Sequence, residues 1–126
     1  MMLTLLVVLQ LSLGVGAQQS APANVLDRIL AIVNGEVVTS SDVRAARQLK
    51  LIAGAEALSD DQLLDALIER RLTVSEVAKY TSAEPPAADV TAKRQAWESS
   101  LPRGTTPAAA LQSVGMRDAA LTTWFR

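Results

Sequence analysis

Large, adaptable apolar side chains occur in the second half of the chain, at Trp97, Met116, Trp124 and Phe125. Aromatic rings and thioethers bind apolar polypeptide segments without requiring one particular sequence. These four residues are therefore candidate peptide-binding residues. Their helical spacing fits a buried core equally well, and this alternative stays open. Because adjacent helical residues point about 100° apart, Trp124 and Phe125 are not expected to face one small core together.

Groups that perform acid–base, nucleophilic or metal chemistry are scarce in this sequence. It contains no histidine and no cysteine. Their absence excludes a Ser-His-Asp triad, a thiol nucleophile, a disulfide framework and a histidine-based metal site. Serine and threonine are plentiful, but no base is available to activate one. We therefore expect no enzymatic activity, no catalytic residue and no cofactor.

Three aspartates, Asp60, Asp61 and Asp65, raise the question of a cation site. They open a predicted helix that Ser59 caps in a capping-box pattern with Gln62. Negative charge is stabilised at a helix N-terminus by the helix dipole, so no metal is needed to account for them. We expect no metal site.

The overall charge is balanced, with 12 basic and 13 acidic residues and a net charge of −1. Nucleic-acid-binding domains usually carry a basic surface, so we expect no nucleic-acid partner. Charges of both signs are mixed along the predicted helices rather than gathered in blocks, which is typical of solvated helix faces.

Residues 1–17 contain no charged side chain and have an apolar core from Leu3 to Leu13. This core has the length of a signal-peptide apolar region and is shorter than the roughly twenty residues that span a bilayer. We predict a signal peptide over residues 1–17, cleaved between Ala17 and Gln18. The predicted location is periplasmic, with no stable membrane insertion after cleavage. Since no Lys or Arg precedes the apolar core, a membrane anchor or a buried helix remains the alternative.

A β-hairpin is predicted at the start of the mature chain, after a flexible spacer over residues 18–24. Strands over residues 28–33 and 36–39 flank Asn34-Gly35. This dipeptide is favoured in two-residue turns that need positive φ at both central positions. The expected cross-strand pairs are Ile32 with Val37 and Leu30 with Thr39.

Caps, glycines, prolines and apolar spacing predict helices in the rest of the chain. The expected ranges are about 42–53, 60–79, 86–100, 107–114 and 116–126. Ser40 or Ser41 is expected to cap the first helix. The second is expected to bury one apolar stripe formed by Leu64, Leu67, Ile68 and Leu72, which Val74 and Val77 extend. The predicted fold is mainly α, with a small N-terminal β-hairpin followed by about five helices in an irregular bundle. Whether the last helix is complete stays open.

Two motifs, in this order, resemble the SurA N-terminal domain family of periplasmic chaperones and parvulin-type peptidyl-prolyl isomerase relatives. Residues 26–39 and Ser41-Asp42-Val43 match the family pattern V-D-R-I-V-A-V-V-N-G-E-V-I-T-x-S-D-V. Residues 66–72 match a helical pattern that contains L-I-D/E-R-x-L. Residues 111–116 followed by Leu121 are similar to the step between the last helices of the family's domain.

The resemblance covers residues 25–126 and implies a SurA N-terminal-like domain. In this family the domain supplies much of the surface of an ATP-independent chaperone that holds unfolded outer-membrane proteins. Isomerase activity belongs to separate parvulin domains, which have histidine-lined sites and are absent from this sequence. The resemblance therefore implies binding of unfolded or extended polypeptides. The alternative is a non-catalytic protein-interaction module or a fragment of a larger parvulin-type isomerase. Uncovered aromatics also make a homodimer a possible state.

Overall fold

The structure is a computed structural model that describes residues 27–126. The predicted signal peptide over residues 1–17, its cleavage between Ala17 and Gln18, and the spacer over residues 18–24 lie outside the described residues. So do the first two residues of the domain predicted over residues 25–126.

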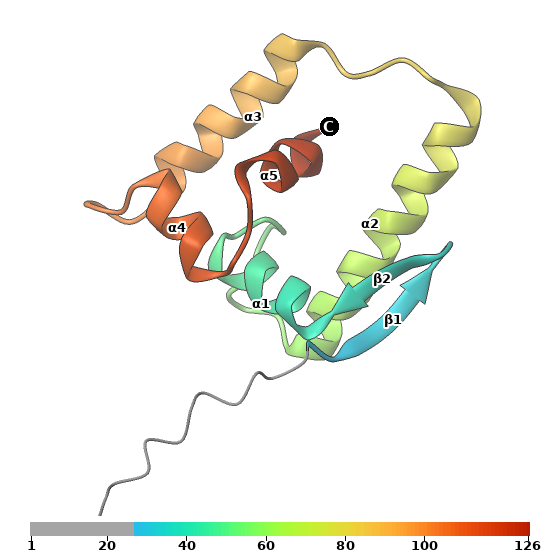
Figure 1. The fold of residues 1–126 in the computed structure, drawn as a ribbon, viewed down its shortest axis with the longest axis horizontal. Coiled ribbons are helices and arrows are strands. Elements are labelled where there is room, and N and C mark those ends of the chain that lie inside the picture. The colour runs from blue at the N-terminus through green and yellow to red at the C-terminus, as the bar shows by residue number, and fades with distance from the viewer. Residues whose placement is uncertain (1–26) are drawn as a thin grey trace, which may run out of the picture.

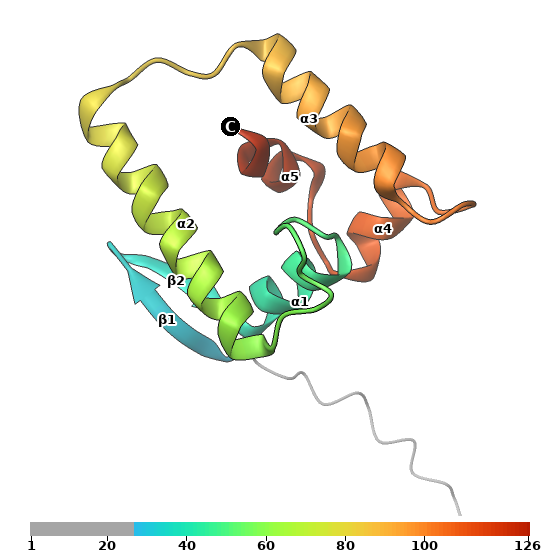
Figure 2. The same cartoon turned by 180° about the vertical axis from the view of Figure 1, so that it is seen from behind.

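Over the described residues, a two-stranded antiparallel hairpin precedes five helices (Figure 1). The elements are β1 (Ile29–Val33), β2 (Glu36–Thr39), α1 (Ser40–Gln48), α2 (Asp60–Tyr80), α3 (Ala87–Ser100), α4 (Pro107–Ser113) and α5 (Asp118–Phe125). The hairpin and α1 lie against α2, while α3, α4 and α5 form a second group connected by residues 81–86 (Figures 1 and 2). The predicted fold class is confirmed.

The hairpin follows the predicted turn, but its register shifts near the start of β1. Asn34 and Gly35 have φ values of 51° and 84°, as the Asn-Gly turn requires. Ile32 pairs with Val37 as expected. The predicted pair of Leu30 with Thr39 is wrong, because Ile29 pairs with Thr39 instead. A register shift between Ile29 and Ala31 places one extra residue in β1, as a β-bulge does.

The first helix starts two residues earlier than predicted and ends five residues earlier. Its N-cap is Thr39, whose hydroxyl accepts the N–H of Asp42, while the Asp42 carboxylate accepts the N–H of Thr39. Ser40 and Ser41 are therefore not caps, and both contact Asp27 instead. The helix ends at Gln48 rather than near Ala53, and Lys50 just beyond it adopts a positive φ of 50°.

The second and fourth helices begin where the sequence predicts. Ser59 and Gln62 form the expected capping box of α2, each side chain accepting the other's backbone N–H at 3.2 and 2.9 Å. Thr106 caps α4, with Pro107 in its first turn. In both places the signal consists of residues three or fewer positions apart, so it acts before any tertiary contact forms.

The apolar residues form two clusters rather than one core. The hairpin cluster consists of Val33, Val38, Val43, Ala46, Ala55, Leu63 and Leu67. The C-terminal cluster consists of Leu49, Trp97, Ala110, Leu111 and Leu121. Trp124 packs against the hairpin cluster, whereas its neighbour Phe125 packs against the C-terminal cluster. The two adjacent aromatics of α5 thus face different clusters, as their angular separation on the helix predicts.

Candidate peptide-binding site

Trp97 is a core residue that connects α3 to the end of α1. Only 6% of its surface is exposed, and its indole Nε1 donates to the carbonyl oxygen of Leu49 at 2.8 Å. Its ring centre lies 6.4 Å from that of Phe125 at an interplanar angle of 53°, a favourable tilted arrangement. Most of this side chain is therefore already engaged within the protein.

Trp124 is half-buried and holds the guanidinium of Arg70 above its ring. The guanidinium carbon lies 4.2 Å from the ring centre, which is within the range of a cation–π interaction. Arg70 also donates to the carbonyl oxygen of Trp124, in the last turn of α5, where a cation complements the helix dipole. Burial lowers the pKa of Arg70. These contacts attach the end of α5 to the middle of α2.

An aromatic pocket of about 390 Å³ lies beside this contact, between α3, the end of α5 and the loop after α1. It brings together Trp97, Trp124 and Phe125, three of the four sequence-predicted residues. Its basic lining residues are Lys50, Arg70, Lys93 and Arg126. Met116 is not part of it. That side chain is half-buried against the C-terminal cluster and lines a separate hollow beside α4.

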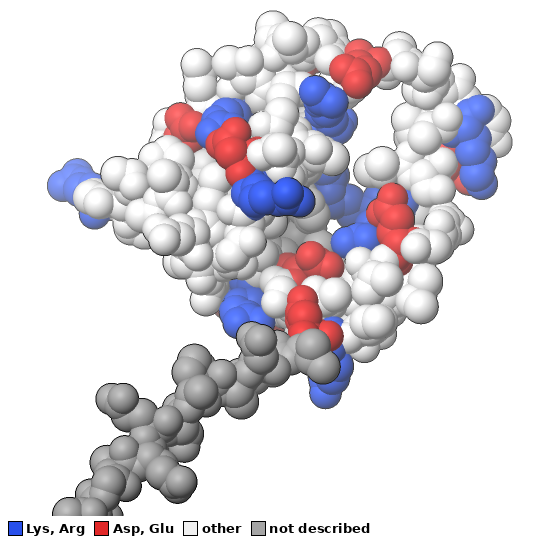
Figure 3. Space-filling view, viewed as in Figure 1, with Lys and Arg blue, Asp and Glu red and all other residues white. Residues whose placement is uncertain are grey.

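A groove of about 460 Å³ lies on the other side of the Arg70–Trp124 contact. It runs between the hairpin tip, the second half of α2 and α5, and Figure 3 shows the surface hollowed between α2 and α5. The residues that line it are Val33, Asn34, Glu36, Arg70, Arg71, Val74, Ser75, Ala78, Ala120, Thr123, Trp124 and Arg126. Trp124 and Arg70 line both depressions, so the groove and the aromatic pocket share one wall.

The second half of α2 carries exposed apolar residues that the sequence places in a buried stripe. Leu72, Val74 and Val77 are 49%, 53% and 53% exposed. The prediction of a continuous buried stripe is therefore wrong beyond Ile68. The predicted helix lengths could have indicated that part of the stripe stays exposed. The first helix, predicted over 42–53, is too short to cover the second, predicted over 60–79.

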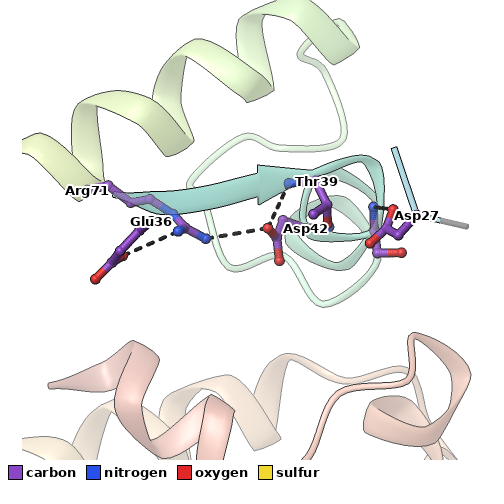
Figure 4. A network of polar contacts seen from close by, with 6 residues as sticks. Asp27, Glu36, Thr39, Asp42 and Arg71 are labelled. Atoms are coloured by element: carbon purple, nitrogen blue, oxygen red, sulfur yellow. Dashed lines mark hydrogen bonds and ion pairs between the residues drawn. The ribbon is translucent and has the colours of Figure 1, made fainter. Parts of the chain in front are cut away.

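A polar network fixes the hairpin side of the groove (Figure 4). Arg71 donates to Glu36 at 3.3 Å and to Asp42 at 3.4 Å, and Asp42 is the carboxylate that also accepts from Thr39. Arg71 therefore connects α2 to β2 and α1.

Asp27 forms a second part of this network at the start of the hairpin. Its Oδ1 accepts the Ser40 hydroxyl at 2.9 Å and the Ser41 N–H at 3.0 Å. Interactions with the side chains of Thr39, Ser40 and Ser41 and with the backbone of Ser41 hold the pKa of Asp27 well below its usual range. The network orders the backbone, and the lowered pKa of Asp27 makes its carboxylate a weak base toward the Ser40 hydroxyl.

One of the three aspartates considered for a cation site, Asp60, takes part in a structural contact. Asp60 pairs with Arg47 at 2.6 Å, and Arg47 also donates to the carbonyl oxygens of Ala55 and Leu58. Within residues 27–126, no group of three or more His, Cys, Asp or Glu side chains could hold a metal ion. In the same range, no helix has the length and apolarity needed to cross a membrane.

Comparison of the chain with protein-family models, curated proteins and solved structures found no match. The resemblance to the SurA N-terminal domain family therefore stays a prediction from the motifs.

Proposed function

We propose that this protein is an ATP-independent, chaperone-like domain that binds extended segments of unfolded polypeptide. The observation that carries the proposal is the groove between α2 and α5, bordered by exposed apolar residues and Trp124. A periplasmic location and unfolded outer-membrane proteins as clients belong to the same proposal and rest on the signal-peptide pattern and the motif resemblance.

The apolar border of the groove supplies a driving force that needs no nucleotide. Full burial of a Val or Leu side chain contributes about 1.5–3 kcal/mol. Because Val74 on this border is already 53% exposed rather than fully so, covering it adds only part of that amount. Association and ordering of a flexible client oppose the gain, so one segment would bind weakly. Weak binding without strict sequence preference suits a protein that holds and releases many segments.

Polar groups at the hairpin tip can also form hydrogen bonds with an extended client. The Asn34 amide donates to the Ser75 hydroxyl at 2.9 Å on the border of the groove. Amide and hydroxyl groups of this kind have further donor and acceptor capacity for the backbone of an extended peptide. The groove therefore combines apolar contact for side chains with hydrogen-bonding groups for the main chain.

Light scattering tests this proposal directly. An unfolded outer-membrane β-barrel protein is diluted into buffer with increasing amounts of the purified protein. We expect suppression of aggregation at near-stoichiometric ratios. Absence of suppression by a protein whose circular dichroism shows it to be folded would contradict the proposal.

Two matched substitutions on α2 assign the activity to the groove. Val74→Asp places a charge on the groove face and should reduce suppression. Leu72→Asp is the control, since Leu72 has a similar exposure (49% against 53%) and lies outside the groove lining. Equal effects of the two substitutions would exclude the groove as the binding site.

The outer face of the hairpin favours the alternative of an interaction module. Ile29 and Ile32 are 59% and 66% exposed. This face could bind a folded partner or a second copy of the chain. Sedimentation velocity distinguishes this case: the alternative predicts a dimer that Ile32→Lys dissociates, without any suppression of client aggregation.

A further inference from the structure

The basic side chains of the aromatic pocket have no acidic counterpart in its lining. Lys50, Arg70, Lys93 and Arg126 line it, and no Asp or Glu does. The chain as a whole has slightly more acidic than basic residues, 13 against 12. This concentration of one sign of charge around three aromatic rings is therefore a local property of the pocket.

Two of these four cations form no ion pair with a protein carboxylate. Lys50 pairs with Glu56 at 3.3 Å, and Arg126 pairs with Glu84 at 3.5 Å. Among the ion pairs of residues 27–126, neither Arg70 nor Lys93 takes part in any. The guanidinium of Arg70 lies over the ring of Trp124 and donates to its carbonyl oxygen, both uncharged groups. A partly buried cation of this kind favours the arrival of an anion.

We propose that the aromatic pocket selects client segments in which an acidic residue stands two positions from an aromatic one. This inference rests on the proposed function and names the class of client segment. The client carboxylate pairs with Arg70 and Lys93, while the client ring packs against Trp124 and Phe125. In an extended chain, residues i and i+2 point to the same side, so both groups enter the pocket together.

Single-stranded nucleic acid is the other ligand that combines negative charge with stacking rings. A nucleic-acid backbone repeats its charge at every nucleotide and therefore needs a continuous basic surface. The adjoining groove adds only Arg71 to that basic surface, since its other two arginines, Arg70 and Arg126, already line the pocket. Arg71 is itself paired with Glu36 and Asp42. The lining therefore favours a polypeptide with one local charge.

Fluorescence anisotropy with three labelled peptides tests the inference. The peptides share an extended apolar sequence with one Phe and differ two positions before it, where they carry Glu, Gln or Lys. We expect the Glu peptide to bind about 5-fold more tightly than the Gln peptide at low ionic strength, as two partly exposed ion pairs would give. The Lys peptide should bind most weakly, and the differences should shrink at high salt.

Substitutions identify the cations responsible. Lys93→Gln should reduce the preference for the Glu peptide over the Gln peptide, because it removes one of the two proposed ion pairs. Arg70→Gln should also reduce the preference for the Glu peptide. It serves as the second variant if Lys93→Gln folds poorly. Arg103→Gln is the matched control, because Arg103 is an exposed basic residue that does not line the pocket. It should leave the preference intact.

The outcomes separate the inference from the proposed function. Equal binding of the Glu and Gln peptides would overturn the charge selection and leave the chaperone proposal standing. Failure of all three peptides to bind, together with no suppression of aggregation, would overturn both. Displacement of the Glu peptide by a single-stranded oligonucleotide as effectively as by unlabelled Glu peptide would reassign the pocket to nucleic acid.

Discussion

The two halves of α2 carry apolar side chains at similar helical spacing but in different surroundings. Leu63 and Leu67 in the first half are 0% and 2% exposed, whereas Val74 and Val77 in the second half are each 53% exposed. Leu63, Leu67 and Val74 are separated by four and seven residues, so they lie on one face of the helix. Composition and periodicity therefore do not explain the difference in burial.

The difference comes from which elements lie beside each half. At 1.5 Å per residue, the 21 residues of α2 extend about 31 Å. The hairpin and α1 cover the first half, and the hairpin tip reaches as far as Ser75 through Asn34. We infer that packing of the first half stabilises the helix, while the second half leaves its apolar side chains available to a client.

The largest expected effect is the difference in stability loss when an apolar side chain is shortened in the first or in the second half of α2. Leu63→Ala should lower the free energy of unfolding by about 3 kcal/mol, because it opens a cavity in the hairpin cluster. Val77→Ala should change it by less than about 0.5 kcal/mol, because that side chain is half-exposed. Urea denaturation measures both. Similar losses for the two variants would show that the second half is also covered.

The next effect concerns Arg70, at the boundary between the halves. Arg70→Met removes the cation–π contact and the bond to the Trp124 carbonyl, and should cost about 1–2 kcal/mol. Hydrogen exchange should accelerate in α5 more than in α1, and Trp fluorescence should change. Arg103→Met is the control on an exposed loop. Unchanged exchange in α5 would contradict the role of Arg70 in holding that helix.

A smaller effect is expected at Arg71, which connects α2 to the hairpin. Both of its ion pairs are partly exposed, so Arg71→Met should cost about 1 kcal/mol and less at high salt. Thermal unfolding at two ionic strengths measures this loss. A cost that does not depend on salt would indicate that packing of the Arg71 side chain, rather than its charge, matters.

The smallest effect is a pH dependence at the start of the hairpin. The folded-state pKa of Asp27 is lowered, so its contribution to stability is fully present above the unfolded pKa of about 4 and decreases as pH falls below it. The pKa of Asp118 is also lowered, by its hydrogen bonds with the Arg94 guanidinium, so this carboxylate contributes to the pH dependence with the same sign. The melting temperature should fall less steeply in acid for Asp27→Asn than for the unsubstituted protein. Identical acid profiles would exclude this contribution.

The turn and the helix starts could be predicted well because their signals are local. Asn34-Gly35 and the Ser59–Gln62 capping box act through residues at most three positions apart. The cap of α1 was wrong for a related reason: Thr39, Ser40 and Ser41 can all cap a helix, and Asp27, twelve or more residues away, engages both serines. Thr39 forms the cap together with Asp42, three residues later, while Asp27 accepts the Ser40 hydroxyl and the Ser41 N–H.

The candidate site was only partly predictable. The sequence identified Trp97, Trp124 and Phe125, which the fold brings to one pocket, and also Met116, which it does not. It did not identify Arg70 or the groove face at Val74. Arg70 gains its role from its contact with Trp124 in α5, and Val74 gains its role from the groove that it lines together with α5. Both depend on a helix about fifty positions along the chain, which no periodicity within α2 predicts.

The sequence by itself determined the hairpin, the order of the helices and most of their boundaries, because those features depend on backbone preferences and capping between near neighbours. Only the tertiary structure decided that Trp97 is buried in a core, that the first half of α2 is covered and that its second half is open. Burial depends on whether a distant element occupies the space beside a side chain. That is a property of the assembled fold, which the same apolar pattern leaves undetermined.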